Sequence, residues 1–310
     1  MKLLLMALLT LSWSFSVAQT ISELHDKAEK KCAQKKYKEA LSIINIAIEK
    51  DPRNIDSRLI IADILKELGE IDKAHTQLSA ALIIDKEHAE VHNRLGLMYL
   101  ENDMLEESLK MYSLAIKHEE NDSIKFSYFL NRASAKSILN QTEGAIKDFE
   151  AAYEINSKSI ALLNNLAATY SKVGESQKSI KMLKEAIVLD PDFLGPYVNL
   201  GLAYSRMDSF TQSDHYFSLA LKINPKEPLI FSNRAFLYYK QNKLKKALND
   251  INKSIDLYPV NSYAYKNRAL IYIAQKKKEE ACIDLEKAIK LGFKNRYGDE
   301  VEKLYKEHCN

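Results

Sequence analysis

The chain has 310 residues and carries 45 Lys and Arg against 42 Asp and Glu, so its charge is high but nearly balanced. Proteins that bind nucleic acid usually carry a basic excess, so we expect no nucleic acid partner. Glycine (8) and proline (6) are both scarce, which is typical of a mostly helical chain.

The beginning of the chain differs from the rest. Lys2 precedes the apolar run LLLMALLTLSWSFSVA, in which Ser16 and Ala18 occupy the minus-three and minus-one positions of a cleavage site. This pattern predicts a secretory signal peptide at residues 1–18, cleaved after Ala18 or Gln19, and a secreted or periplasmic protein. Serines and threonines interrupt the run, and it is shorter than a spanning helix requires, so we expect no stable membrane span after cleavage.

From Ile21 onward the chain repeats itself every 34 residues. NRAFLYYKQNKLKKALNDINKSI begins at Asn233, and NRALIYIAQKKKEEACIDLEKAI begins at Asn267. Similarity at a fixed period of this length indicates a repeat protein. Extending the register in both directions leaves only residues 123–125 outside the period and gives eight repeats, at residues 21–54, 55–88, 89–122, 126–159, 160–193, 194–227, 228–261 and 262–295.

Three positions of every repeat hold only Ala, Gly or Ser, and a fourth is always large and apolar. In the seventh repeat, for example, the small residues are Ala235, Ala247 and Ser254, and the large one is Ile251. Small residues at fixed places allow two helices to approach to about 8–10 Å, and the large side chain fills the space beside the crossing. The prolines fall where a second helix must stop or in the first turn of a first helix, so each repeat is predicted to be an antiparallel helix pair.

This pattern resembles the tetratricopeptide repeat over nearly the whole mature chain. The resemblance implies an all-α fold, a right-handed α-solenoid of about eight antiparallel helix pairs at residues 19–295, whose first helices line a concave face. Residues 296–310 contain a short amphipathic segment, Asp299–His308, that we expect to cap the last pair.

If the first helices line a groove, the sixth position of five successive repeats faces it. These positions are Asn131, Asn165, Asn199, Asn233 and Asn267. An asparagine side chain offers two donors and one acceptor, which match the backbone of an extended peptide. The tetratricopeptide superhelix of O-linked GlcNAc transferase uses a similar row, but no catalytic domain follows here. The alternative is a structural role, in which each asparagine bonds to the neighbouring helix.

Apolar and aromatic residues accompany the asparagines. Leu202, Phe236 and Leu270 occupy the ninth position of the last three repeats, and Tyr239 and Tyr263 should also face inward. Such groups beside fixed amides could form the wall of a peptide-binding groove. The competing interpretation is that they pack against the next helix or the C-terminal cap.

Three cysteines are present, Cys32, Cys282 and Cys309. In an oxidising compartment, Cys282 on the last second helix and Cys309 on the cap could form a disulfide; the alternative is that both are small buried hydrophobic residues. His88 and His92 are four residues apart, but they straddle a repeat boundary with no third ligand in an obvious place. No nucleophile motif or phosphate-binding loop is present, so we expect no enzyme, no cofactor and no metal site.

Together these features predict a non-catalytic adaptor or scaffold of the cell envelope, which holds an extended segment of a protein or peptide partner in its concave groove. The alternative is a structural subunit that forms an oligomer through its ends or its convex face.

Overall fold

The computed structural model describes residues 20–309, and within them the chain consists of helices and short connections, with no strand. The predicted signal peptide lies outside the described residues. No helix in the described part is long and apolar enough to cross a membrane. The all-α fold class predicted from the sequence is confirmed.

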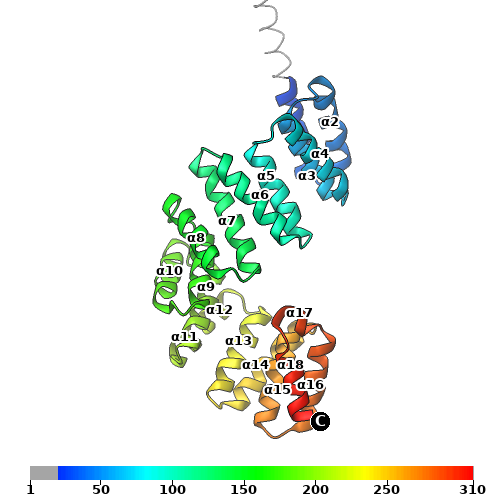
Figure 1. Cartoon of the computed structure of the whole chain (residues 1–310). Coiled ribbons are helices and arrows are strands. Elements are labelled where there is room, and N and C mark those ends of the chain that lie inside the picture. Colours follow the sequence, from blue (N-terminus) through cyan, green and yellow to red (C-terminus); the bar gives the residue numbers. More distant parts are fainter. Residues whose placement is uncertain (1–19, 310) are drawn as a thin grey trace, which may run out of the picture. The chain divides into compact units, whose positions relative to one another are not determined.

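The helices divide into two compact units, with the boundary between Ile155 and Asn156. The N-terminal unit begins with a helix at residues 20–33, followed by α2 (Tyr37–Lys50), α3 (Ile55–Glu67), α4 (Ile71–Ile84), α5 (Ala89–Glu101), α6 (Leu105–His118), α7 (Asp122–Ile138) and α8 (Thr142–Ile155). The C-terminal unit contains α9 (Ile160–Lys172), α10 (Ser176–Leu189), α11 (Leu194–Arg206), α12 (Phe210–Ile223), α13 (Pro228–Lys240), α14 (Leu244–Leu257), α15 (Ser262–Ala274), α16 (Lys278–Lys290), α17 (Phe293–Tyr297) and α18 (Glu300–Cys309). In each repeat from the second to the eighth, the first and second helices pack as a pair (Figure 1).

The three residues outside the period extend a first helix. The other first helices from α3 to α15 have 13 residues, whereas α7 has 17 and begins at Asp122. The extra residues therefore add about one turn at the start of α7, and the helix pair that follows keeps its register.

The fifteenth position of all eight repeats has a left-handed backbone, and there it forms the turn between the two helices of a pair. Glycine occupies this position only at Gly69 and Gly174; the others are Lys35, Asp103, Asn140, Asp208, Asn242 and Lys276, with φ between 53° and 60°. Asn and Asp tolerate this conformation better than other residues with a side chain, whereas lysine is strained there by roughly 1 kcal/mol. The turn is therefore imposed by the packing of the two helices, and residue preference decides only how much strain remains.

The helix crossings are as close as the small residues predicted. A Cβ atom added to Gly96 would lie 2.7 Å from the ring of Tyr112, and one added to Gly201 would lie 2.6 Å from the ring of Phe217. At both crossings a serine of the second helix bonds the glycine carbonyl, because Ser108 Oγ donates to Gly96 at 2.8 Å and Ser213 Oγ donates to Gly201 at 2.7 Å. Because glycine has no side chain, the aromatic ring and the serine hydroxyl of the second helix lie directly against the glycine backbone.

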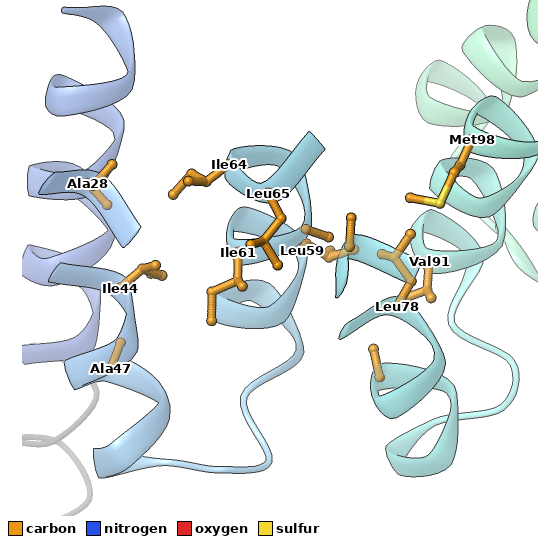
Figure 2. Packing of buried hydrophobic residues seen from close by; sticks show 14 of the residues in the cluster. Ala28, Ile44, Ala47, Leu59, Ile61, Ile64, Leu65, Leu78, Val91 and Met98 are labelled. Atoms are coloured by element: carbon orange, nitrogen blue, oxygen red, sulfur yellow. The ribbon is translucent and has the colours of Figure 1, made fainter. Parts of the chain in front are cut away.

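The hydrophobic core lies between the helix layers of each unit. In the N-terminal unit, Ile44 of α2 and Ile64 of α3 are at most 1% exposed and point toward each other (Figure 2). Because neither helix could cover these side chains alone, each repeat depends on the next one for burial of its apolar face.

A buried ion pair recurs in three repeats and explains the arginine of the NRA motif. The guanidinium at the seventh position donates two hydrogen bonds to the aspartate at the twenty-third position, on the second helix of the same repeat. The pairs are Arg132–Asp148 (2.8 and 2.7 Å), Arg234–Asp250 (2.6 and 3.1 Å) and Arg268–Asp284 (2.7 and 2.8 Å). The aspartates are at most 4% exposed, so these bidentate pairs fix the two helices of a repeat within the low-dielectric interior.

Two short helices, α17 and α18, cap the last repeat; the sequence predicted one, at Asp299–His308, which corresponds to α18. Phe293 of α17 and Val301 of α18 are at most 1% exposed and belong to the same core as Leu285 of α16. Cys282 and Cys309 are joined by a disulfide with a Cα–Cα distance of 5.6 Å. Cys32, in the N-terminal unit, is free and half-buried.

Candidate functional site

The asparagines of the sixth position do not all have the same surroundings. Three of them donate to a side chain at the fifth position of the preceding repeat: Asn131 to Asn93 at 3.0 Å, Asn199 to Asn164 at 2.8 Å and Asn267 to Ser232 at 3.3 Å. These amides connect successive first helices, which is the structural role that the sequence left open.

The other two asparagines make no side-chain hydrogen bond to another described residue. Asn165 is exposed and Asn233 is half-buried. The fifth-position residue before Asn233 is Val198, whose side chain cannot accept a hydrogen bond. In the C-terminal unit, Asn165 and Asn233 are therefore the members of the row whose amides remain available to a ligand.

Aromatic residues of α13 and α15 gather around a lysine. The rings of Phe236 and Tyr239 are stacked, with centroids 5.9 Å apart, and both are half-buried. Lys266 Nζ lies 5.6 Å from the centroid of Phe236 and 5.3 Å from that of Tyr263. Burial raises the pKa of Tyr263 above its ordinary value, so this phenol stays neutral and able to donate at physiological pH. We call Phe236, Tyr239, Tyr263 and Lys266 the aromatic–lysine cluster.

The cap takes part in this cluster. The ring of Tyr297, in α17, lies 5.5 Å from that of Tyr263, so packing against the cap, the competing interpretation of the sequence, applies to Tyr263. Leu202 and Leu270, at the same repeat position as Phe236, are half-buried on α11 and α15, and Leu202 packs beside the apolar core around Tyr197 and Phe217.

Lys266 was not predicted as a site residue. Only 5% of its surface is exposed, and its ammonium forms an ion pair of 3.0 Å with Glu300, the first residue of α18. The sequence did contain a signal for this residue, because Lys266 at position five of the last repeat accompanies Tyr263 at position two of the same repeat and Phe236 at position nine of the preceding one. Its partner could not be read from the repeats, because Glu300 lies outside them.

A cleft of about 750 Å³ lies at the beginnings of α13 and α15, and the cluster residues themselves do not line it. Tyr297 connects the two, since it contacts Tyr263 and also lines the cleft. Four lining residues are large, apolar or aromatic and about half exposed: Leu229 (52%), Tyr258 (48%), Val260 (55%) and Tyr297 (50%). Such exposed side chains around one concavity are typical of an interaction surface.

A polar network connects the first helices α3, α5 and α7 of the N-terminal unit. Glu90 accepts hydrogen bonds from Arg94 at 2.8 Å, from Tyr128 at 3.0 Å and from Asn93 at 3.3 Å, and Arg94 also pairs with Asp63. Because these polar groups already form hydrogen bonds with one another, this surface leaves fewer of them available to a partner than the C-terminal unit does.

The two histidines noted in the sequence have local roles. His88 accepts from the backbone of Val91 at 3.4 Å at the start of α5, and His92 bonds the carbonyl of Lys86 at 2.9 Å. Within residues 20–309, no group of three His, Cys, Asp or Glu residues is arranged to hold a metal ion.

Comparisons with solved structures show the fold. A tetratricopeptide repeat protein from Parabacteroides merdae has a TM-score of 0.66 at 19% identity, over 94% of this chain and 100% of its own. PilF of Pseudomonas aeruginosa has a TM-score of 0.60 at 15% identity, over 68% of this chain and 94% of its own. Yeast Tom70 has a TM-score of 0.60 at 17% identity, over 89% of this chain and 59% of its own. The comparison with curated proteins gives no match.

Family models of the tetratricopeptide repeat match most of the sequence. They cover residues 32–98, three successive repeats at residues 126–159, 160–193 and 194–227, and residues 233–292. The three successive matches begin and end where the 34-residue period places the repeats. With the helix pairs and the small-residue crossings described above, these matches show that the chain belongs to the tetratricopeptide repeat family.

Proposed function

We propose that the chain is a non-catalytic adaptor or scaffold of the cell envelope, and that it holds an extended segment of a protein partner along the first helices of the C-terminal unit. Its tetratricopeptide repeats and the solved structures with the same repeats support a role in protein interaction. The observation that carries the proposal is the aromatic–lysine cluster on α13 and α15, beside a cleft with four half-exposed apolar or aromatic residues.

Two kinds of contact would hold the segment. The available amides of Asn233 and Asn165 would bond its main chain, since each offers two donors and one acceptor. The stacked rings of Phe236 and Tyr239 would receive its side chains, because half-buried aromatic residues supply large contact area with little conformational entropy to lose.

The envelope location rests on the signal-peptide pattern at residues 1–18. The disulfide between Cys282 and Cys309 supports it, because disulfides persist mainly in oxidising compartments.

The alternative, assembly into an oligomer, has less support. The most exposed apolar residues, Ile83 (81%) and Val188 (82%), lie in different units on α4 and α10. Exposed apolar residues that are scattered singly are normal on a soluble surface. Light scattering of the purified chain distinguishes the two: an adaptor stays monomeric without its partner, whereas an assembly subunit gains mass with concentration.

A comparison of co-purified proteins tests the adaptor proposal. Wild type, a Phe236→Ala, Tyr239→Ala double variant and a Val188→Ala control would be purified from the cell envelope, and bound proteins would be identified by mass spectrometry. We expect the control to retain the partner and the double variant to lose it, with helical content unchanged by circular dichroism. A double variant that retains the partner at the wild-type level would contradict the proposal.

A further inference from the structure

Lys266 is buried in a way that favours a carboxylate beside it. Only 5% of the residue is exposed, and the faces of the Phe236 and Tyr263 rings lie within 5.6 Å of its ammonium. Aromatic faces attract a cation, but a lysine taken out of water also needs acceptors for its three donors. An ammonium left without an acceptor in such a place is destabilising, so a negatively charged group beside it is favoured.

Glu300 supplies that group from outside the repeats. Its Oε1 lies 3.0 Å from Lys266 Nζ, yet its side chain is 53% exposed, whereas that of Lys266 is 6% exposed. One partner of the ion pair is therefore fixed inside the protein, and the other reaches in from the solvent side. An approaching carboxylate could replace the second partner without disturbing the first.

The cap does not depend on Glu300 for its position. Val301, the next residue of α18, is fully buried, and Cys309 at the far end of the same helix is bonded to Cys282 of α16. Glu300 can therefore leave Lys266 by rotation of its own side chain while α18 stays in place.

We propose that Lys266 is the receptor for a carboxylate of the partner segment, and that Glu300 is an internal competitor that occupies this place when no partner is bound. The inference rests on the proposed function, because the segment reaches Lys266 along Phe236 and Tyr239. Exchange of one carboxylate for another keeps the buried ammonium paired throughout, which simple opening would not. The acidic group should be flanked by apolar residues, since Tyr297 and Leu229 continue the surface on the cleft side.

Three short peptides test the proposal by NMR titration of the mature chain with its disulfide intact. N-acetyl-Phe-Glu-Phe-amide carries a side-chain carboxylate, N-acetyl-Phe-Phe carries a terminal one, and N-acetyl-Phe-Gln-Phe-amide carries none. The variant Glu300→Gln removes the competitor. Its matched control is Asp299→Asn, which removes an exposed carboxylate from the same cap, where Asp299 pairs with Lys303 at 3.1 Å.

We expect Glu300→Gln to bind at least one carboxylate peptide about two- to fivefold more tightly than wild type, as loss of a half-exposed competing ion pair implies. Asp299→Asn should match wild type, and the neutral peptide should show no gain. Lys266→Met should abolish the preference for carboxylate, and Lys266→Arg should restore part of it, which separates charge recognition from loss of folding. Tighter binding of the glutamate peptide alone would assign the site to acidic side chains, and tighter binding of the free acid alone would assign it to a chain terminus.

If neither carboxylate peptide binds more tightly than the glutamine peptide, or if Glu300→Gln leaves the affinity for both carboxylate peptides unchanged, the inference is overturned and the peptide-binding surface is left intact. Failure of every peptide, including the neutral one, to bind any variant would overturn the proposed function and the inference with it.

Discussion

The asparagine row provides a quantitative test, because its members have the same sequence position and different surroundings. Asn199 donates to Asn164 at 2.8 Å, and both residues are half-buried. Removing one such hydrogen bond costs about 1 kcal/mol. Asn199→Ala should therefore lower the Tm of the C-terminal unit, which has about 150 residues, by roughly 2–4 °C. Asn233→Ala removes no side-chain hydrogen bond, so it should leave the Tm nearly unchanged.

Asn267 extends the same comparison to a fully buried site. It is 1% exposed, and its partner Ser232 is 0% exposed, so Asn267→Ala would leave a buried hydroxyl without its donor. That loss costs about 1–3 kcal/mol. Thermal unfolding of the chain, followed by circular dichroism, would measure all three variants, with exposed Asn165→Ala as the control. If Asn233→Ala lowered the Tm as much as Asn199→Ala, the division of the row into structural and available amides would be wrong.

Three further predictions concern the turns, the buried ion pairs and pH. Lys276→Gly relieves a left-handed backbone (φ 60°) and should stabilise the C-terminal unit by about 1 kcal/mol in urea unfolding, whereas Lys277→Gly, at an ordinary φ of −100°, should not. Arg268→Met leaves Asp284 buried without its cation and should cost about 3 kcal/mol, most of which the double variant with Asp284→Leu should recover; a single variant that unfolds like wild type would refute this. Burial lowers the pKa of His92 in the folded chain. As the pH falls below about 6.5, the imidazole of His92 is therefore protonated in the unfolded chain before it is protonated in the folded chain. Stability of the N-terminal unit should fall there by at most about 1.4 kcal/mol per pH unit, and less steeply in His92→Gln; equal slopes would contradict this role.

Much of the fold could be predicted because its causes are local and repeat. Small residues at the crossings, such as Gly201, and large ones beside them, such as Phe217, determine how the two helices of a pair meet. The ion pairs were also present in the sequence, since arginine at position seven and aspartate at position twenty-three occur in the same three repeats. Recognising them required a comparison of two positions on different helices, which a search along one helix face does not make.

The candidate site was only partly predictable. Phe236, Tyr239 and Tyr263 were selected from the faces of their helices. The structural role of Asn199 could have been predicted from Asn164, the polar residue at the fifth position of the preceding repeat. Glu300 could not, because the cap follows no period and its placement depends on the burial of Val301. A contact made by a segment outside the repeats has no counterpart in the other repeats from which to infer it.

Site-specific photo-crosslinking tests the central claim most directly. A photoreactive residue, p-benzoylphenylalanine, would replace Tyr239 on a first helix of the C-terminal unit or, as the control, Val188 on a second helix of the same unit, in cells that express the full chain. The account predicts that the Tyr239 position forms a covalent adduct with one partner protein, that the Val188 position does not, and that Phe236→Ala in the same chain weakens the adduct. An adduct formed equally from both positions, or from Val188 alone, would contradict it.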